Sequence, residues 1–392
     1  MTESMLTGSW PSYDSDEIRA VAQVLESGTG NYWFGDQCRR FEEEYAAHCR
    51  TRYGIALANG SVALELALEA AGIGSGDEVV VTPRSFIASA SCVIRVGASP
   101  VFADVDPDSQ NITPESVAEV LTPATKAIIA VHLAGWPCDM SGLMNVAKQR
   151  GLVVIEDCAQ AHGAAIDRRP VGGFGHIGVF SFCHDKIITT GGEGGLLVTD
   201  DEVIWRSAWS IKDHGKDYDE VHRTDAAPGF RWLHSAIGTN WRMTEMQAAI
   251  GRVQLGKLDA WHARRTANAK RLIETLSQYR CVRVPVPPAN IEHAYYRLYA
   301  FVEPAKLKNG WSRDSILTAL KHKKMPYMSG SCPEIYREKA FQDRGLGRSE
   351  PLPVAAALGE TSLAFVVHPT LTDADMDAYC SALDEILSKA TA

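Results

Sequence analysis

The residue with the clearest capacity for covalent chemistry is a lysine that precedes a cluster of small residues. Lys186 follows a short apolar run around Phe180 and comes just before the segment from Thr189 to Gly195, which holds four glycines. A lysine amine can form a Schiff base with an aldehyde, and glycines let a ligand approach the backbone closely. Because most lysines are exposed surface residues, a solvated turn residue is the alternative interpretation of Lys186.

A carboxylate stands at the end of an apolar run that is predicted to be a strand. Asp157 directly follows residues 152–156, and an unpaired carboxylate is costly to bury. The charge of Asp157 therefore needs a cationic partner, and a protonated pyridine nitrogen would serve. The alternative is that Asp157 caps the following helix.

A second predicted strand end offers a place for a phosphate. Asn59, Gly60 and Ser61 lie where a strand leads into a helical pattern. The free amides of the first helical turn, together with the positive end of the helix dipole, can hold a phosphate. The alternative is that Ser61 is a plain helix cap.

The hydrophobic pattern predicts a scaffold that brings these strand ends together. Short β-branched runs alternate with helical stretches between Tyr53 and Glu156. Strands are expected at 53–58, 78–82, 100–104, 126–132 and 152–156, with helices at 63–71, 87–96, 114–121 and 140–150. This alternation predicts an α/β fold with a large, mostly parallel sheet flanked by helices, in which ligands bind at the carboxyl ends of the strands.

The remaining segments suggest two domains. Helices are expected at 15–27, 37–47, 312–321 and 373–387, strands near 282–286 and 295–302, and one long helical stretch over 243–276. Residues 208–218 form a polar segment, and residues 221–240 form an irregular one. We therefore expect a large domain over residues 1–255, with the N-terminal helices, and a smaller C-terminal α+β domain over residues 256–392.

Composition narrows the class of protein. The chain has 392 residues, 45% of them apolar and 22% charged, which is typical of a globular protein. The net charge of -9 and the absence of a long basic run argue against nucleic acid, and no apolar run is long enough for a membrane span. The nine cysteines form no CxxC pair and the first ten residues show no secretion signal, so we expect a cytoplasmic protein without a metal site.

Several motifs, taken in chain order, resemble the DegT/DnrJ/EryC1/StrS family of pyridoxal-phosphate-dependent sugar aminotransferases. The motifs are Asn59-Gly-Ser61, Asp104-Val-Asp106, Val131-His-Leu-Ala-Gly135, Glu156-Asp-Cys-Ala-Gln-Ala-His-Gly163, Ser181-Phe with Lys186, Gly192-Glu-Gly-Gly195, His214-Gly215 and Asn240-Trp-Arg-Met-Thr-Glu-Met-Gln-Ala-Ala-Ile250. The resemblance runs along nearly the whole chain. It implies the type I fold of pyridoxal-phosphate-dependent transferases, which is the aspartate aminotransferase fold, and it implies pyridoxal 5'-phosphate as the cofactor.

The resemblance also implies roles for individual residues around that cofactor. Lys186 would form the Schiff base and carry protons, and Asp157 would pair with the pyridine nitrogen. The other expected cofactor-binding residues are Gln160 at the ring hydroxyl, Phe86 on the ring face, and Gly60, Ser61 and Ser181 at the phosphate. Asn240 would come from the neighbouring subunit, which implies a homodimer with shared active sites.

The implied reaction moves an amino group, expected to come from L-glutamate, onto a ketosugar used in lipopolysaccharide, another surface polysaccharide or a secondary metabolite. The ketosugar would be nucleotide-linked or a keto-octulosonic acid that is aminated at C8. The alternatives are a sugar dehydratase on the same scaffold and a non-catalytic regulatory homologue. In a dehydratase branch of the family a histidine replaces the lysine, so the presence of Lys186 favours amino transfer.

Six further residues are candidates for contacts with the substrate. The guanidinium groups of Arg84, Arg231 and Arg242 suit a diphosphate or a carboxylate. His184, beside the lysine, is a second acid or base or else a packed side chain. The remaining two candidates are Trp33, in an aromatic loop that either lines a pocket or only packs, and Ser329, at the start of a segment that takes the place of a histidine-containing substrate loop in many family members.

Overall fold

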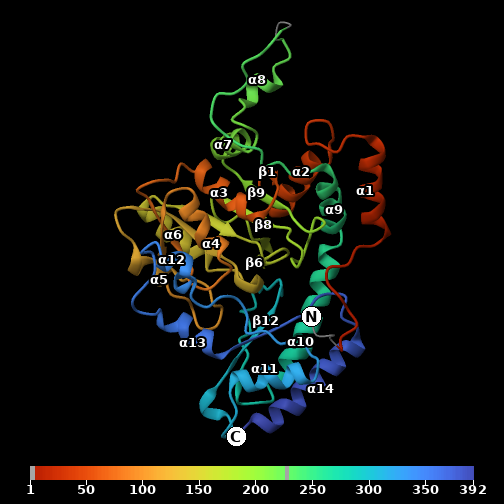
Figure 1. The fold of residues 1–392 in the computed structure, drawn as a ribbon, viewed down its shortest axis with the longest axis vertical. Helices are drawn as coiled ribbons and strands as arrows, with labels where there is room; N and C mark the ends of the chain where they lie inside the picture. Colours follow the sequence, from red (N-terminus) through yellow and green to blue (C-terminus); the bar gives the residue numbers. More distant parts are fainter. Residues whose placement is uncertain (1–4, 226–228) are drawn as a thin grey trace.

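The computed structural model describes residues 5–225 and 229–392. Figure 1 shows a larger body built around a sheet, a smaller body that holds the C-terminus, and an arm carrying α8 (Tyr218–His222) that projects from the larger body. Helix α10 (Leu258–Leu276) leads from the larger body to the smaller one. The cavity described below is lined by residues from both bodies.

The larger body is organised around a seven-stranded sheet. In spatial order its strands are β1 (Tyr53–Leu57), β9 (Gly195–Thr199), β8 (Ile177–Ser181), β5 (Val153–Asp157), β4 (Thr125–Val131), β2 (Glu78–Val81) and β3 (Ser99–Phe102). Neighbouring strands from β8 to β3 are parallel, and β9 is antiparallel to both of its neighbours. The predicted mostly parallel sheet is therefore confirmed.

The register of the central strands brings their carboxyl ends to one edge. Val131 at the end of β4 pairs with Asp157 at the end of β5, and Asp157 pairs with Val179 of β8. Strand β8 then continues by two residues to Ser181. Polar side chains that follow these strands are consequently close together.

Helices form most of the rest of the larger body. They are α1 (Ser15–Ser27), α2 (Gln37–Cys49), α3 (Gly60–Ala70), α4 (Ala88–Arg95), α5 (Pro114–Val120), α6 (Met140–Arg150), α7 (Glu202–Lys212) and α9 (Glu245–Leu255), with a short 3-10 turn η1 (Leu133–Gly135). A second small sheet contains β6 (Ala165–Ile166), β7 (Arg169–Pro170) and β11 (Ile291–Glu292). Among the helices in the described ranges, none has the length and apolar character that a membrane span requires.

Three details of the expected elements differ from the structure. Helix α3 begins at Gly60 and not at residue 63, because the Asn59 side chain accepts a hydrogen bond from the Val62 amide at 3.0 Å and caps the helix there. The expected polar segment 208–218 is wrong over its first part, since α7 extends to Lys212 and buries Trp209. The expected long helix over 243–276 is two helices, α9 and α10, separated at Gly256, a residue with low helix propensity.

The smaller body contains an antiparallel sheet of β10 (Val282–Arg283), β12 (Leu298–Val302) and β13 (Ser362–Phe365). Helices α10, α11 (Arg313–His322) and α14 (Asp373–Ala390) pack with this sheet in a second hydrophobic core. The chain between its strands also forms α12 (Lys339–Gln342), α13 (Pro353–Thr361) and the 3-10 turns η2 (Pro304–Lys306) and η3 (Ile335–Arg337). This α+β arrangement matches the predicted one, and the division of the chain after residue 255 stays a prediction.

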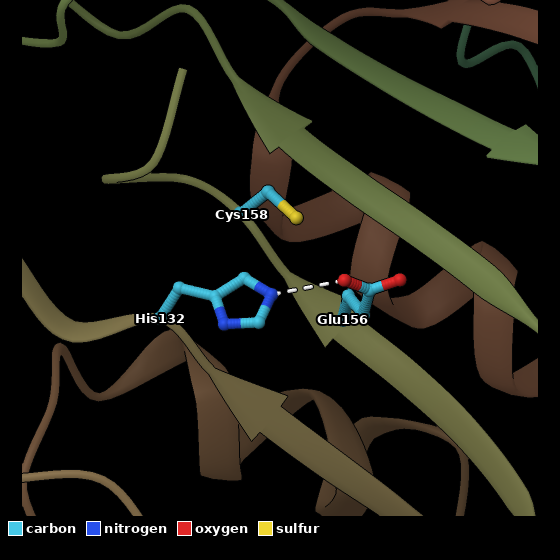
Figure 2. Close-up of side chains that lie close together, drawn as sticks. All are labelled: His132, Glu156 and Cys158. Atoms are coloured by element: carbon cyan, nitrogen blue, oxygen red, sulfur yellow. Dashed lines mark hydrogen bonds and ion pairs between the residues drawn. The ribbon is translucent and has the colours of Figure 1, made fainter. Parts of the chain in front are cut away.

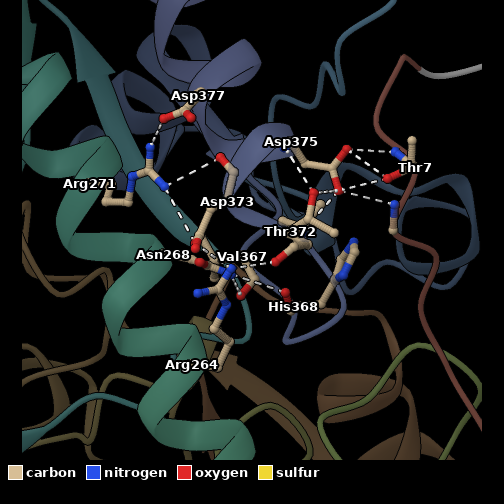
Figure 3. A network of polar contacts seen from close by, with 12 residues as sticks. Thr7, Arg264, Asn268, Arg271, Val367, His368, Thr372, Asp373, Asp375 and Asp377 are labelled. Atoms are coloured by element: carbon tan, nitrogen blue, oxygen red, sulfur yellow. Dashed lines mark hydrogen bonds and ion pairs between the residues drawn. The ribbon is translucent and has the colours of Figure 1, made fainter.

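The N-terminal segment is attached to the smaller body through one carboxylate at the start of α14. Figure 3 shows Asp375 accepting hydrogen bonds from the amide and hydroxyl of Thr7 and from the hydroxyl of Thr372. The Gly8 amide also donates to it at 3.3 Å. Burial opposes ionisation of Asp375, but the hydrogen bonds from Thr7 and Thr372 outweigh it and hold its pKa well below the ordinary value of 3.8.

We predict that Asp375→Asn lowers the free energy of unfolding by about 1.5 kcal/mol or more, because charge-assisted hydrogen bonds are replaced by weaker ones. Because the folded-state pKa is depressed, the stabilisation should be present above pH 3.8 and be lost as pH falls below it. Thermal unfolding of both proteins between pH 3 and pH 7 measures this effect. A difference in Tm that stays constant down to pH 3 would contradict the assignment.

Candidate active site

All predicted cofactor-binding residues except Asn240 meet in one cavity of about 1040 Å³ at the carboxyl ends of β4, β5 and β8. The predicted residues that line it are Gly60, Ser61, Phe86, Asp157, Gln160, Ser181 and Lys186. They come from segments more than 120 positions apart in the chain, from Gly60 to Lys186. Their convergence follows from the parallel register of the sheet.

One end of the cavity is formed by the start of α3 against the end of β8. A side chain at Gly60 would place its Cβ 2.6 Å from the Cβ of Ser181, so only glycine allows this close packing. The Asn59 cap leaves the first amides of the helix, at Gly60 and Ser61, without partners inside the helix. These amides and the Ser181 hydroxyl form a donor set that suits a phosphate.

A histidine beneath this end is a packed residue. Nε2 of His162 lies 2.9 Å from the Ser181 carbonyl, and Nδ1 lies 2.6 Å from the Tyr45 hydroxyl. Burial lowers the pKa of His162 to about 3, so the ring is neutral. Its role is to hold the end of β8 in place, and it does not reach the cavity.

Asp157 forms the floor of the cavity and has no cationic partner in the described ranges. Its side chain is buried, with Oδ2 accepting from the Ser89 hydroxyl at 2.7 Å and Oδ1 from the Ala159 amide at 3.1 Å. Two neutral donors orient the carboxylate but leave its charge unbalanced. A protonated ring nitrogen of a bound ligand fits this position.

Gln160 stands beside Asp157 and is held in a fixed orientation. Its Oε1 accepts a hydrogen bond from the Ala134 amide at 2.7 Å. Ala134 and Gly135 both have positive φ angles, of 58° and 95°, which turn the chain sharply after β4. With its oxygen occupied, the side-chain amide nitrogen of Gln160 is the group available to a ligand.

Lys186 is placed by a turn whose backbone is fixed on both sides. Its amide donates to the Cys183 carbonyl at 3.0 Å, and its carbonyl accepts from the Trp10 indole at 2.8 Å. The Nζ atom lies 4.9 Å from the centre of the Tyr296 ring. The amine is thus oriented within the cavity by an aromatic face and not by a direct carboxylate contact.

Asp185 was not among the residues predicted for the site, and it shares this corner of the cavity. The Tyr296 hydroxyl donates to its carboxylate, and the Arg297 guanidinium lies 3.5 Å away. Burial raises the pKa of Asp185, but the nearby charge of Lys186 and the bond from Tyr296 outweigh burial and lower the pKa overall. The carboxylate is therefore ionised beside the lysine.

The opposite wall of the cavity comes from the smaller body, and the sequence indicated it only through the predicted substrate segment that starts at Ser329. Its residues are Tyr296, Arg297, Tyr299, Met328, Gly330, Ser331, Cys332, Glu338 and Ala364. The aromatic run before β12 is a second sequence signal that could have indicated it. No strand-end pattern predicts the others, because they reach the cavity only through the packing of the two bodies.

The candidate substrate residues and Asn240 do not line this cavity in the part of the chain that the structure describes. Arg84 is fully buried behind the wall, and Trp33 packs edge-on against Trp209. Arg242 pairs with Asp213 at 2.6 Å. Of the others, Arg231 pairs with Glu220 on the arm, and Asn240, His184 and Ser329 are exposed.

A buried group with potential metal ligands lies next to the cavity. Figure 2 shows His132, Glu156 and Cys158 together, with His132 Nε2 3.0 Å from Glu156. His132 Nδ1 accepts from the Cys138 amide, so Nε2 carries the proton and donates to Glu156. Both ring nitrogens are thus occupied, and the cluster serves to anchor β5 from beneath.

The fold and the cavity define a class of protein. A lysine, a buried carboxylate without a counter-charge and a helix N-terminus face one space at the carboxyl edge of a mostly parallel sheet. This donor set fits pyridoxal 5'-phosphate. The model of the DegT/DnrJ/EryC1/StrS aminotransferase family matches residues 11–384, and the chain belongs to this family.

Known proteins agree with this assignment. The X-ray structure of an aminotransferase from Psychrobacter cryohalolentis is 52% identical, with a TM-score of 0.95 and coverage of 97% of this chain and 98% of that one. The spore coat polysaccharide biosynthesis protein SpsC of Bacillus subtilis is 33% identical over 97% of each chain. A UDP-N-acetyl-3-dehydro-alpha-D-glucosamine 3-aminotransferase from Acidithiobacillus ferrooxidans is 35% identical over 91% of this chain and 90% of its own. The protein is an aminotransferase with pyridoxal 5'-phosphate as its cofactor.

We predict that Gly60→Ala raises the dissociation constant for pyridoxal 5'-phosphate by about tenfold or more, because overpacking of this size costs about 1–3 kcal/mol. The added methyl would press on the Ser181 side chain at the phosphate end. Titration of apoenzyme with cofactor, followed by absorbance, gives the constant. Gly30→Ala is the matched control, since nothing lies within 4 Å of a Cβ there. Equal affinity of the two variants would rule out a phosphate site at Gly60.

Proposed function

We propose that this sugar aminotransferase transfers the amino group of L-glutamate to the carbonyl carbon of a nucleotide-linked ketosugar for surface-polysaccharide or secondary-metabolite biosynthesis. The observation that carries the proposal is the position of Lys186 between a floor of cofactor-type residues and a wall of polar residues from the smaller body. The name of the Acidithiobacillus relative, which specifies a UDP-linked substrate, supports a nucleotide-linked sugar.

The cofactor, when bound, supplies an electron sink that stabilises negative charge on the reacting carbon. Asp157 would face the ring nitrogen and keep it protonated, and the amide nitrogen of Gln160 would donate to the ring hydroxyl. The amides of Gly60 and Ser61 and the hydroxyl of Ser181 would hold the phosphate. Phe86 is 65% exposed at the cavity, which leaves its ring free to cover the cofactor face.

Lys186 would move the proton of the reaction. Its Nζ would take the proton from the α-carbon of the amino donor and, in the second half of the reaction, deliver a proton to the sugar carbon. The Tyr296 ring limits where this amine can lie, at 4.9 Å from Nζ. Hydrogen bonds already fix the backbone of Lys186, so this residue loses little further conformational freedom when the reaction takes place.

The wall from the smaller body supplies groups suited to a polyhydroxylated substrate. Tyr299, Ser331 and Glu338 line the cavity opposite the cofactor residues. The hydroxyls of Tyr299 and Ser331 can donate hydrogen bonds to sugar hydroxyls or accept them, and the Glu338 carboxylate can accept them. Arg297, also on this wall, offers a cation for an acidic group of the amino donor.

The active enzyme is proposed to be a homodimer with shared sites. Asn240 is exposed, forms an isolated bridge with Asp213, and does not line the cavity of its own chain. The arm carries Phe230, Trp232 and Ile237, which are 80%, 86% and 95% exposed. Exposed apolar residues of this size favour burial against a second copy, which would bring Asn240 to the partner's phosphate site.

A cytoplasmic location is also proposed. All nine cysteines are free, and most of them are buried. Unpaired thiols persist in a reducing compartment.

A panel of carbonyl substrates tests the proposal. Purified holoenzyme is incubated with L-glutamate and either nucleotide-linked ketosugars or a keto-octulosonic acid, and formation of 2-oxoglutarate is measured. We expect turnover with at least one nucleotide-linked ketosugar. Turnover with the octulosonic acid alone would replace the proposed substrate class, and sugar dehydration without consumption of glutamate would replace the proposed reaction.

We predict that Lys186→Ala abolishes amino transfer, with a loss of at least about 1000-fold, because the variant lacks the amine that would carry the proton. The substitution should leave the fold intact, which circular dichroism and Tm can show. The control is Lys126→Ala, at an exposed lysine of β4 far along the strand from its carboxyl end. Normal turnover by the Lys186 variant would show that another residue reacts.

A subunit-mixing experiment tests the shared sites. We predict that Lys186→Ala and Asn240→Ala proteins, each inactive alone, regain about a quarter of wild-type activity when they are unfolded together and refolded as random dimers. One site of each hybrid would then combine an intact Lys186 with an intact Asn240. If Asn240 acts in its own chain, the hybrids stay inactive.

A further inference from the structure

Arg84 lies behind the cavity at the junction of its two walls. It belongs to the segment 83–89, of which Ser85, Phe86 and Ser89 line the cavity, and Ser89 also holds Asp157. Across the cavity stands the segment 328–332 of the smaller body. Arg84 itself is 0% exposed.

The guanidinium of Arg84 binds neutral oxygens on separate elements. Its Nε donates to Gln110 Oε1 at 2.8 Å, and its Nη2 donates to the Ser362 hydroxyl at 2.9 Å. Ser362 begins β13 and in turn donates to the Ser329 carbonyl at 2.6 Å. Through two hydrogen bonds Arg84 thus reaches Ser329, within the segment 328–332.

Tyr299 continues this connection on the cavity side. The Arg84 guanidinium lies 5.8 Å from the centre of the Tyr299 ring. The Tyr299 hydroxyl accepts a hydrogen bond from the Ser331 amide at 2.8 Å, and its ring packs against Gly330 so tightly that a Cβ there would lie 2.4 Å away. The positions of Gly330 and Ser331 therefore depend on where Tyr299 stands.

Backbone contacts join the two walls on either side of Arg84. Ser85 forms an isolated bridge with Cys332, and the Ile335 amide donates to the Pro83 carbonyl at 2.8 Å. Arg84 lies between these two contacts in sequence. The side chain of Arg84 can therefore set the distance between the two walls, and both backbone contacts depend on that distance.

The environment of Arg84 points to geometry and not to charge pairing. Within residues 5–225 and 229–392 no carboxylate forms an ion pair with it, and burial lowers its pKa. A planar fork with several donors can satisfy Gln110 and Ser362 at once, which a lysine ammonium cannot do in the same geometry. Burying this cation without a carboxylate partner costs free energy, and the contacts that Arg84 makes between the two walls must offset that cost.

We propose that Arg84 is a positioning residue that sets the substrate-side wall, residues 328–332 and Tyr299, relative to the cofactor-side wall, residues 83–89. The identity of the substrate in this inference rests on the proposed function, whereas the structural link does not. Loss of Arg84 frees the substrate-side wall and leaves the cofactor-binding residues on β5 and β8 in place.

The test compares Arg84→Lys and Arg84→Met with the wild-type holoenzyme. We expect KM for the ketosugar to rise about tenfold or more in both variants, while the dissociation constant for the cofactor stays within about twofold. Arg84→Lys keeps the positive charge but not the planar fork, so a raised KM in this variant shows that the geometry of the arginine matters and not its charge alone. A cofactor constant that rises in parallel with KM, or a full rescue by lysine, would overturn the proposal.

Amide hydrogen exchange gives a readout that requires no substrate. The amides of Ser331 and Ile335 bridge to Tyr299 and Pro83, so they should exchange faster in both variants. Unchanged exchange at both amides contradicts the proposal even if no ketosugar is turned over. If both variants exchange faster but the wild type turns over no sugar, the structural link through Arg84 is supported and only the proposed function is contradicted.

Arg313→Met is the matched control. Arg313 is also half-buried and donates to the carbonyls of Gly359 and Ser362, but no hydrogen bond or ion pair among the described residues joins it to residues 83–89, and only its charge acts on Arg84. We expect its KM and its Ser331 exchange to match the wild type, and an equal effect in this variant would reduce Arg84 to a general stabilising role.

If Arg84→Met does not fold, Ser362→Ala removes the same link from the other side. A folded Ser362→Ala protein with unchanged KM and exchange would refute the proposal.

Discussion

Two adjacent buried carboxylates at the end of β5 determine the rest of the site. Successive side chains of a strand point to opposite faces, so Glu156 and Asp157 meet different surroundings. Glu156 receives hydrogen bonds from His132 and from the amides of Gly172, Phe174 and Gly175. Burial opposes its ionisation, but these bonds outweigh it and lower its pKa. Asp157 receives only neutral donors and keeps an unbalanced charge for a ligand.

The cavity has two faces with separate origins. The face with Asp157, Gln160 and Lys186 is built from strand ends of the large sheet, whose positions are fixed by backbone pairing. The face with Tyr299 and Ser331 comes from the smaller body and is fixed by side-chain contacts. Chemistry common to the family can thus be kept on the first face while the second changes with the substrate.

The corner around Lys186 combines restraint with opposing charges. The Trp10 indole and the Cys183 carbonyl fix the lysine backbone, and the Tyr296 ring faces its amine. Asp185 is held by Tyr296 and Arg297, so its negative charge stays beside the lysine. A proton carrier gains from this arrangement because little has to reorganise when its charge changes.

The sequence by itself determined the parallel sheet, the order of its elements and the cofactor face, because these follow from local periodicity and from residues at strand ends. Asp157 and Lys186 could be selected in this way, and the resemblance added Gln160 and Phe86. Only the tertiary structure decided that Arg84 is a buried link and that Tyr296, Tyr299 and Glu338 form the opposite wall. Their positions arise from packing between segments about 100 or more residues apart, which leaves no periodic signal in the chain.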